Sequence, residues 1–498
     1  MEFRLTLSAD VSTKSASVRR HMGRCLATNV RNALRRELPT SKVVTAHDHL
    51  VVRLPSHVDD AQHTWALDTL ANTPGIQKIA HIQRRELGDW QVTLARLALE
   101  KAEQVEGRAF RIKVRRKGSH AFNSVDAERF LGAELLRHTR HAKVNLTHPD
   151  LTISLRLDGA ELIDEVATTA GIGGFPLGTQ DQALMLMSGG FDSPVAAYRM
   201  LRRGIKCHFI LFRFGGEAQE QAVRQLTHDL WRRFCASHKV SFTSVPFEKV
   251  VDQLTQEVPD GLVSLVLKRH MVAAAARVAQ RARIPALVTG EVIAQVSSQT
   301  LSNLGLIDNA SHLPVLRPLL TEDKQSIIDE ARRIGTAQAS SQMPEYCGGM
   351  SARPLVKTSL AALEEAEARL PADLLDDALS RMRQFSADDP GKAELTPCQP
   401  LDELTIAELT AAADATIRVI DVRSPDEAAR RPLTIAGHEV EHVPFYELAT
   451  RAAELSRDSR YLLYCDQGIM SRLQALSLKD QGLPRVGVLL ARSKHDAA

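Results

Sequence analysis

The chain has 498 residues, of which 44% are hydrophobic and 25% are charged, and its formal net charge is +3. This composition is typical of a globular protein, and the length favours three or four domains. It excludes a membrane span, since no run of about 18 apolar residues occurs, and a disulfide scaffold, since only six irregularly spaced cysteines are present. The N-terminus lacks the apolar core of a signal peptide, so we expect a cytoplasmic protein.

Charge is distributed unevenly along the chain. Residues 1–150 contain 25 basic and 16 acidic residues, whereas residues 361–410 contain 4 basic and 12 acidic residues. The basic first part indicates a polyanionic partner, for which RNA or DNA is the usual candidate. An ordinary solvated surface would give the same balance.

The first 85 residues predict a small α+β unit. Strand-like and helix-like hydrophobic periods alternate in the order β-α-β-α-β, which fits a ferredoxin-like unit. The expected elements are a strand at 3–7, a helix at 18–38, a strand at 50–54, a helix at 59–72 and a strand at 76–82.

A second α/β segment carries a basic strand. A helix is predicted at 89–105 and a strand at 110–116, whose apolar residues alternate with basic ones. The basic side chains suit an RNA backbone, although a solvated strand face is an equally good interpretation. They are Arg111, Lys113, Arg115, Arg116 and Lys117.

Glycines at 171–178 predict a linker or a packed turn. Between 180 and 335, short apolar strands alternate with helices, which predicts a doubly wound parallel sheet. Its strands are expected at 183–187, 206–212, 241–247 and 286–290. An acidic helix and a linker follow, and another small α/β unit begins near Leu401.

The sequence Ser-Gly-Gly-Phe-Asp-Ser at 188–193 follows the buried strand at 183–187. We expect Ser193 to cap the next helix and Pro194 to be its first residue. Glycines here let backbone N–H groups approach a pyrophosphate, and Asp192 can help to hold Mg²⁺. A plain glycine-rich turn is the less specific alternative.

This loop resembles the PP-loop of N-type ATP pyrophosphatases, which split ATP between its α- and β-phosphates and leave AMP on the substrate. Further motifs resemble the tRNA 4-thiouridine synthetase family over essentially the full length. They are Lys268-Arg269, Thr289-Gly290-Glu291, residues 295–300, Arg317-Pro318-Leu319, Asp323-Lys324 and residues 343–348.

The resemblance implies an α/β multidomain architecture. Its expected parts are a ferredoxin-like domain at 1–60, a THUMP RNA-binding domain at 61–168, a PP-loop domain at 177–375, a linker at 376–400 and a rhodanese-like domain at 401–498.

The same resemblance implies an ATP site and no tightly bound cofactor or zinc. The residues expected to bind ATP are Leu186, Met187, Ser188, Gly189, Gly190, Asp192, Ser193, Leu211, Phe212, Lys268, Gly290, Gln299 and Lys324.

Cys465 lies between an apolar strand at 461–464 and a helix. Such an arrangement aims backbone N–H groups at the sulfur and favours a thiolate that can hold a persulfide. The segment resembles a rhodanese active loop, with Asp421-Val422-Arg423 as the strand-end signature. Met470 stands where many rhodaneses carry a polar residue, which favours a protein sulfur donor over thiosulfate.

Cys347 lies in a glycine-flanked loop. The family resemblance marks it as the resolving residue that forms a disulfide with Cys465. Cys25, Cys207 and Cys235 are expected to be core thiols, and Cys398 to be incidental.

Taken together, the motifs and the resemblance predict ATP-dependent insertion of sulfur at the uracil 4-position of tRNA uridine 8. A pyridoxal-phosphate cysteine desulfurase is the implied persulfide donor. The resemblance also implies sulfur transfer to a carrier protein for thiamine, and it allows a homodimer. The alternatives are a sulfur carrier for thiamine alone and an RNA-binding module with a vestigial nucleotide domain. Asp192, Lys268 and Gln299 argue against the vestigial alternative.

Overall fold

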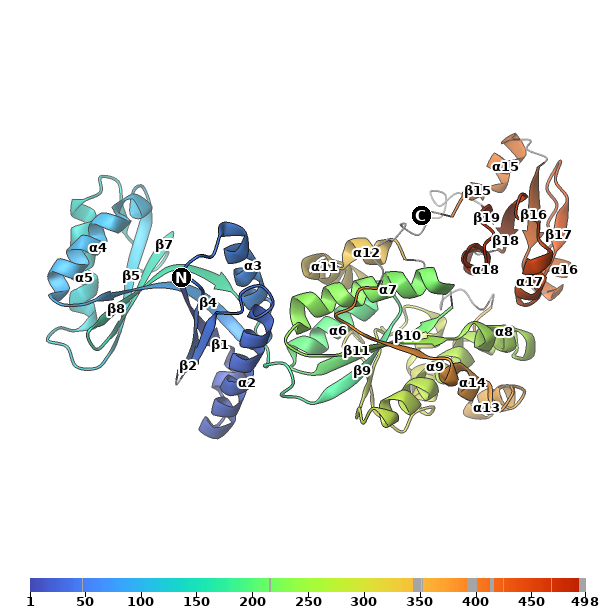
Figure 1. Cartoon of the computed structure of the whole chain (residues 1–498), viewed down its shortest axis with the longest axis horizontal. Helices are drawn as coiled ribbons and strands as arrows, with labels where there is room; N and C mark the ends of the chain where they lie inside the picture. The colour runs from blue at the N-terminus through green and yellow to red at the C-terminus, as the bar shows by residue number, and fades with distance from the viewer. Residues whose placement is uncertain are drawn as a thin grey trace. The chain divides into compact units, whose positions relative to one another are not determined.

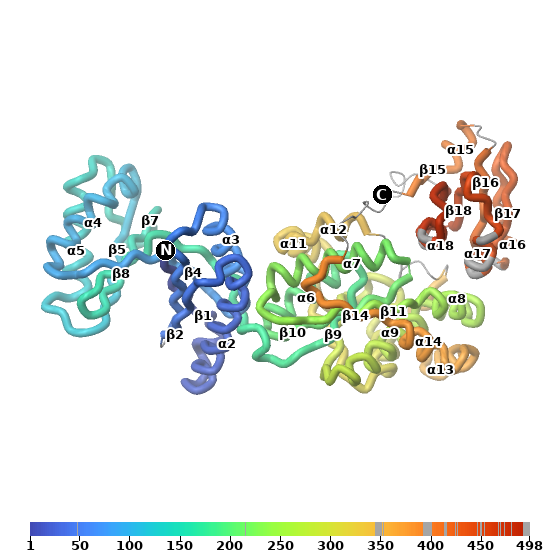
Figure 2. The backbone as a smooth tube through the Cα atoms, in the orientation of Figure 1, coloured from blue at the N-terminus to red at the C-terminus, as the bar shows by residue number. Residues whose placement is uncertain are grey.

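The computed structural model describes residues 1–46, 48–214, 216–343, 351, 353–391, 401–412, 416–423, 425–466 and 468–491 (Figures 1 and 2). The chain divides into two compact units. One comprises Met1–Thr179 with Arg202–Gly204, and the other comprises Gln180–Leu201 with Ile205–Ala498. None of the helices in the described part of the chain is both long enough and apolar enough to cross a bilayer.

The first unit is built on one eight-stranded sheet in the order β2-β3-β1-β4-β8-β7-β5-β6. Its strands are β1 (Glu2–Leu7), β2 (Lys42–Thr45), β3 (His49–Arg53), β4 (Ile76–Glu86), β5 (Ala109–Lys117), β6 (Lys143–Val144), β7 (Leu151–Asp158) and β8 (Glu161–Ala170). Its helices are α1 (Ala9–Ser12), α2 (Ala16–Leu34), α3 (Asp60–Ala71), α4 (Trp90–Val105) and α5 (Ser124–Arg137). The predicted β-α-β-α-β order and the basic strand are both present.

The long strand β4 joins the two halves of this sheet, because it pairs with β1 on one side and with β8 on the other. The pairing of β4 with β8 shifts between His81 and Ile82, where Val166 of β8 is the extra residue. Such a bulge reverses which residues of the bulged strand face each side of the sheet.

Both helix pairs cover the same face of the sheet. Phe3 and Leu5 of β1 pack with α2 and α3, and they pair with His81 and Ile79 of β4. Beyond the bulge, Leu162 of β8 packs in the core under α4 and α5 and pairs with Arg85, which lies on the same face of β4 as His81. Consequently, no helix among the described residues of this unit covers the other face of the sheet.

The glycine-rich segment 171–178 is a packed turn. Gly75 N–H donates to the carbonyl of Gly173 at 2.8 Å, and Phe175 N–H donates to the carbonyl of Arg202 at 3.0 Å. These bonds tie the segment to the first unit. Of the two alternatives that the sequence left open, a linker and a packed turn, the structure therefore confirms the packed turn.

In the second unit, a six-stranded sheet has the order β13-β12-β9-β10-β11-β14 and is parallel except for β14. Its strands are β9 (Gln182–Met187), β10 (Lys206–Arg213), β11 (Ser241–Pro246), β12 (Leu287–Val288), β13 (Val315–Leu316) and β14 (Arg383–Ser386). The helices around it are α6 (Asp192–Arg202), α7 (Gly216–Leu230), the π-helical turn η1 (Trp231–Cys235), α8 (Glu248–Glu257), α9 (Asp260–Arg281), η2 (Ser297–Gln299), α10 (Leu301–Asp308), α11 (Lys324–Ile334), α12 (Ala337–Ser341), α13 (Leu360–Glu367) and α14 (Leu374–Ser380).

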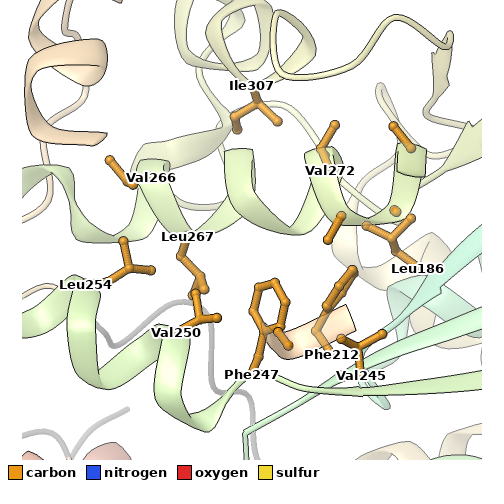
Figure 3. Packing of buried hydrophobic residues seen from close by; sticks show 14 of the residues in the cluster. Leu186, Phe212, Val245, Phe247, Val250, Leu254, Val266, Leu267, Val272 and Ile307 are labelled. Atoms are coloured by element: carbon orange, nitrogen blue, oxygen red, sulfur yellow. The ribbon is translucent and has the colours of Figure 1, made fainter. Parts of the chain in front are cut away.

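The parallel sheet forms because its central strands are apolar on both faces, so helices must cover each side. Figure 3 shows one of these layers, in which Leu267 of α9 and Val250 of α8 pack near Phe212 and Phe247 at the ends of the strands. Phe212 and Phe247 lie with ring centroids 4.5 Å apart. The doubly wound sheet predicted from the sequence is confirmed.

Part of the predicted linker at 376–400 is instead ordered on this sheet. Residues Arg383–Ser386 form β14, which pairs antiparallel with β11. A four-residue edge strand is held mainly by backbone hydrogen bonds, so its sequence shows little periodicity.

A five-stranded parallel sheet in the order β15-β19-β18-β16-β17 follows. Its strands are β15 (Glu403–Thr405), β16 (Ile417–Asp421), β17 (Val440–His442), β18 (Arg460–Tyr464) and β19 (Val486–Leu490). Its helices are α15 (Ile406–Ala412), α16 (Pro425–Arg430), α17 (Phe445–Arg451), η4 (Ala452–Glu454) and α18 (Ile469–Asp480). This is the small α/β unit expected from residue 401.

A buried ion pair links α4 to the first sheet and generates a stability prediction. Lys101 Nζ lies 2.8 Å from Asp164 Oδ2, and the two side chains are 6% and 2% exposed. Lys101→Met should lower the free energy of unfolding by about 3–5 kcal/mol, because it leaves a buried carboxylate without its cation. Urea titration followed by hydrogen exchange of α4 and β8 peptides measures this loss.

The double variant Lys101→Met with Asp164→Leu is the matched control. It should recover most of the loss, because neither charge then remains buried. A single variant as stable as the double variant would contradict the role assigned to this pair.

Candidate active site

The loop at 188–193 joins β9 to α6 at the carboxyl end of the parallel sheet. Ser188 N–H donates to Ser193 Oγ at 3.2 Å, and the two hydroxyl oxygens lie 3.3 Å apart. Helix α6 begins at Asp192, so Ser193 lies within the first turn and not at the predicted cap. Instead of capping the helix, the Ser193 hydroxyl bonds with Ser188 and so holds the two ends of the loop together.

A cavity of about 180 Å³ opens beside this loop, at the ends of β9, β10 and β12. Ligands bind at this edge of parallel α/β sheets. Most of the residues predicted to bind ATP line the cavity: Leu186, Met187, Ser188, Gly190, Asp192, Ser193, Phe212, Lys268, Gly290 and Gln299.

Three predicted residues do not line it. Leu211 is buried on β10 next to Phe212, but it is not among the residues that line the cavity. Gly189 contacts Met343 instead, and Lys324 is an exposed residue at the start of α11. At these three positions a role in ATP binding stays a prediction.

The cavity has an apolar wall and a polar wall. Phe212, Phe214 and Ile307 contribute to the apolar side, which suits a planar base. Ser188, Asp192 and Lys268 lie on the polar side, beside the backbone of Gly190. The two walls together can hold a ligand with an aromatic ring at one end and anionic groups at the other.

Glu291 is the central charge of the polar wall, and sequence reasoning did not name it as a site residue. Lys268 Nζ lies 2.9 Å from Oε1 of Glu291, and Arg317 Nε lies 2.9 Å from Oε2. Burial alone would raise the pKa of Glu291, but the charges and hydrogen bonds of Lys268 and Arg317 hold that pKa below its ordinary value. Glu291 is therefore a buried anion that fixes a lysine in the cavity.

Sequence reasoning also missed other lining residues: Phe214, Gln219, Met271, Val272, Thr289, Gln295, Val296 and Ile307. Met271 and Val272 could have been found, because they lie three and four residues after Lys268 and so share its helix face. Phe214 and Ile307 carry no such signal.

Close backbone approaches explain two glycines. A Cβ on Gly290 would lie 2.8 Å from the backbone of Asp192 and Ser193, so only glycine lets the end of β12 meet the loop. Gly189 has φ +87°, and a Cβ there would lie 2.3 Å from Met343 Sδ. The segment around Met343 therefore packs directly on the loop.

Cys347 lies outside the described residues, but described residues before and after it contact the 188–193 loop and α9. Before it, Met343 packs on Gly189, and Ser340 Oγ donates to the carbonyl of Gly190 at 3.3 Å. After it, Ser351 Oγ lies 3.0 Å from Ser264 Oγ, one turn before Lys268 on α9.

Cys465 ends β18 and precedes α18, as predicted. Ser471 N–H donates to Cys465 Sγ at 3.4 Å, and the Ser471 hydroxyl lies at the same distance. Next to it, Arg423 bridges Asp421 at 2.7 Å and Asp466 at 3.1 Å. This network fixes the residue that follows the cysteine and joins the predicted signature to the loop.

The other described cysteines have different surroundings. Burial raises the pKa of Cys207 far above its ordinary value and raises the pKa of Cys235 to about 12. Both are inert core thiols, as predicted. Cys25 is partly exposed on α2, and Cys398 lies outside the described residues.

The basic strand β5 has the predicted two faces. Its apolar residues are buried, whereas Lys113, Arg115, Arg116 and Lys117 are exposed. Beyond the first two residues, which pair with β6, the strand forms the edge of the sheet. Arg111 Nε donates to Thr152 Oγ1 at 3.0 Å, and Lys117 pairs with Asp158 at 3.7 Å.

No cluster of three or more His, Cys, Asp or Glu side chains suited to a metal occurs among the described residues. Asp192 accepts a hydrogen bond from Gln295 Nε2 at 3.3 Å in the cavity. A magnesium ion there would need oxygen ligands from a bound phosphate as well, which is usual for Mg²⁺.

Comparison with known proteins agrees with this architecture. The thiamine biosynthesis protein (ThiI) family model matches residues 178–371, and the THUMP domain model matches residues 91–162. The tRNA sulfurtransferase of Serratia proteamaculans is 42% identical over 488 residues, covering 98% of this chain and 99% of that protein. The tRNA sulfurtransferase of Yersinia enterocolitica is 43% identical over 489 residues, with the same coverage.

Two solved structures are also similar. The crystal structure of a 4-thiouridine synthetase–RNA complex with bound ATP has a TM-score of 0.68 and 25% identity, covering 77% of this chain and 99% of that one. PH1313 from Pyrococcus horikoshii has a TM-score of 0.52 at 19% identity, which shows a common fold.

The contact between Gly189 and Met343 generates a prediction. Gly189→Ala should lower the free energy of unfolding by about 1–3 kcal/mol, because it forces a positive φ on alanine and displaces the Met343 sulfur. Gly305→Ala is the matched control, since its Cβ on α10 would meet nothing within 4 Å. The Tm of each variant measures the difference, and equal Tm values would contradict the role given to Gly189.

Proposed function

Because the chain belongs to the tRNA sulfurtransferase family, we propose that it uses ATP to replace the 4-oxygen of tRNA uridine 8 with sulfur. The observation that carries this proposal is the meeting of the 188–193 loop with Lys268, Gly290 and Gln299 in one cavity. The activity is that of a tRNA uracil 4-sulfurtransferase.

ATP binds with its adenine against the apolar wall and its phosphates toward the polar wall. Leu186, Met187 and Phe212 contact the base, and Gly290 and Gln299 also line the cavity. Backbone N–H groups of the 188–193 loop and the start of α6 stabilise the phosphates. Lys268 supplies the fixed cation inside the cavity. Lys324 stays a predicted phosphate contact, and its side chain would have to reach the phosphates from outside the cavity.

Asp192 is the residue that would hold Mg²⁺ together with phosphate oxygens. The ion would supply charge neutralisation on the phosphates. Gln295 orients the Asp192 carboxylate through its amide hydrogen bond.

The first chemical step activates the uracil. Its 4-oxygen attacks the α-phosphorus of ATP, the bond to the β-phosphate oxygen breaks, and pyrophosphate leaves. The uracil then carries AMP on that oxygen, which makes C4 open to displacement. Positioned donors and cations stabilise charge in such a transition state.

Sulfur comes from a persulfide on Cys465. Ser471 N–H and its hydroxyl lie beside the sulfur and stabilise negative charge on it. Attack of the Cys347 thiolate on Cys465 Sγ breaks the S–S bond and releases the outer sulfur at the sulfide level for displacement of AMP. The two cysteines are oxidised to a disulfide, which a thiol reductant restores.

The partners follow from these steps. The basic residues of β5, Arg111, Lys113, Arg115, Arg116 and Lys117, contact the tRNA backbone. A cysteine desulfurase loads the rhodanese-like unit at 401–498, and Met470 beside the loop favours such a protein donor. The cytoplasm is the expected compartment, and the enzyme is expected to work alone or as a homodimer.

A second function is favoured by the description of the matching family model, which names thiamine biosynthesis. The Cys465 persulfide is also a suitable donor to a sulfur-carrier protein for the thiamine thiazole. This route needs only the 401–498 unit and not the ATP cavity.

Removing the Asp192 carboxylate tests the adenylation step. Asp192→Asn should lower the 4-thiouridine content of tRNA at least about a hundredfold, because phosphate charge is no longer balanced in the transition state. Nucleoside analysis of tRNA from cells carrying the variant measures the product. Asp329→Asn, an exposed acid on α11, is the control and should be unchanged. Wild-type 4-thiouridine in the Asp192 variant would refute adenylation at this cavity.

The sulfur relay is tested at Cys465. With cysteine, a desulfurase, ATP and tRNA supplied, Cys465→Ala should form no 4-thiouridine, because no persulfide can be carried. Cys25→Ala is the matched control, as Cys25 is a partly exposed thiol outside the site. Survival of the activity in the Cys465 variant would show that the sulfur takes another route.

A further inference from the structure

The face of the eight-stranded sheet that no described helix of this unit covers, here called the helix-free face, carries a row of basic residues. Some of them come from strands other than β5. Backbone pairing places Arg156 of β7 beside Arg115 of β5 and beside Ile163 of β8. Ile163 in turn pairs with Arg84 of β4. Arg4 of β1 pairs with Ala80, which lies four residues before Arg84 on the same face of β4. These arginines therefore share the side of the sheet that no helix covers.

Acidic partners neutralise only one half of this face. Arg84 pairs with Glu2 at 3.0 Å and with Glu161 at 2.7 Å, and Lys78 pairs with Glu165 at 2.8 Å. Within the described residues, no ion pair engages Lys113, Arg115 or Arg156 on β5 and β7. Positive charge is thus left uncompensated toward the β5 edge.

Two arginines at the centre of the face have unused donors away from water. Arg4 is only 6% exposed, yet its Nε has no hydrogen-bond partner. The Nε of Arg156 is also buried without a partner. A buried donor left unsatisfied is unfavourable, so this arrangement favours an added acceptor.

The arginines are close enough to affect each other. Burial lowers the pKa of Arg4, and the neighbouring charges of Arg156 and Arg115 lower that pKa further. Asp48 and Glu165 form ion pairs with Arg4 at 3.6 Å and 3.8 Å, which is longer than a hydrogen bond. Neighbouring guanidinium groups whose donors are not all used are typical of an anion site.

We infer that Arg4, Arg156 and Arg115 form a binding site for a phosphate of the RNA backbone on the helix-free face. The inference rests on the proposed function, because it takes tRNA as the ligand, and it extends the RNA contact from the β5 edge to the middle of the sheet. Guanidinium groups match phosphate oxygens in geometry as well as in charge.

Asp48 competes with the phosphate for this site. Its carboxylate is 61% exposed and lies at the turn before β3, near Arg4. Burial would raise the pKa of Asp48, but its hydrogen bond to His49 and the charges of His49, Arg4 and Arg156 hold that pKa below the ordinary value. A bound phosphodiester would take the place of this weakly held anion.

The experiment measures tRNA affinity of the full-length chain across a series of KCl concentrations. Arg156→Gln should weaken binding about three- to tenfold and reduce the slope of log K against log [KCl] by about one, as expected for one lost phosphate contact. Asp48→Asn should tighten binding, because it removes the competing anion. ATP binding of each variant, which takes place in the other unit, should stay at the wild-type value.

Arg96→Gln is the matched control. It removes the same charge from the exposed side of α4, on the face that carries the helices, and should leave the slope unchanged. Equal effects of Arg96→Gln and Arg156→Gln, or no gain from Asp48→Asn, would overturn the site while leaving the proposed function intact. Absence of salt-dependent tRNA binding by the wild-type chain would instead refute the proposed function.

Discussion

Glu291 lies between Lys268 and Arg317, and this buried group of charges is what allows a cation to stand in a largely apolar cavity. A lone lysine there would lose solvation without compensation, and a lone carboxylate would repel phosphates. Because Glu291 holds Lys268 and Arg317, Lys268 keeps one position. An anionic ligand that enters the cavity therefore meets a cation that is already in place. The glycine before Glu291 brings this group against the start of α6, so charge and phosphate loop meet at one place.

The cysteines that handle sulfur do not use the polar groups of Glu291, Lys268 and Arg317. Met343 and Ser351 lie before and after Cys347 in the chain, and they contact Gly189 of the 188–193 loop and Ser264 of α9. Cys465 has its own sheet, its own donor in Ser471 and its own ion network around Arg423. Activation of the acceptor and storage of sulfur therefore rely on different polar groups.

Sequence reasoning predicted what rests on local pattern. The 188–193 loop, the alternation on β5 and the strand before Cys465 each leave a short-range signal, and the structure contains them all. Glu291 was missed as a site residue because its role depends on Arg317, which meets it only in the folded chain. Strand β14 was missed for the same reason, since it is defined by its neighbour β11 and not by its own residues. The single helix-free face could not be predicted either, because the register of β4 and β8 decides it.

That register has a consequence for how such chains can be recombined. The extra residue Val166 in β8 is the point at which the pattern of inward and outward side chains changes parity. A chimera that joined the first half of this sheet to a second half lacking the bulge would turn Leu162 and Asp164 of β8 outward and would turn Glu161 and Glu165 inward. Either half of the sheet must therefore keep the bulge when the halves are recombined. A length difference of one residue at the bulge is more damaging than many substitutions elsewhere.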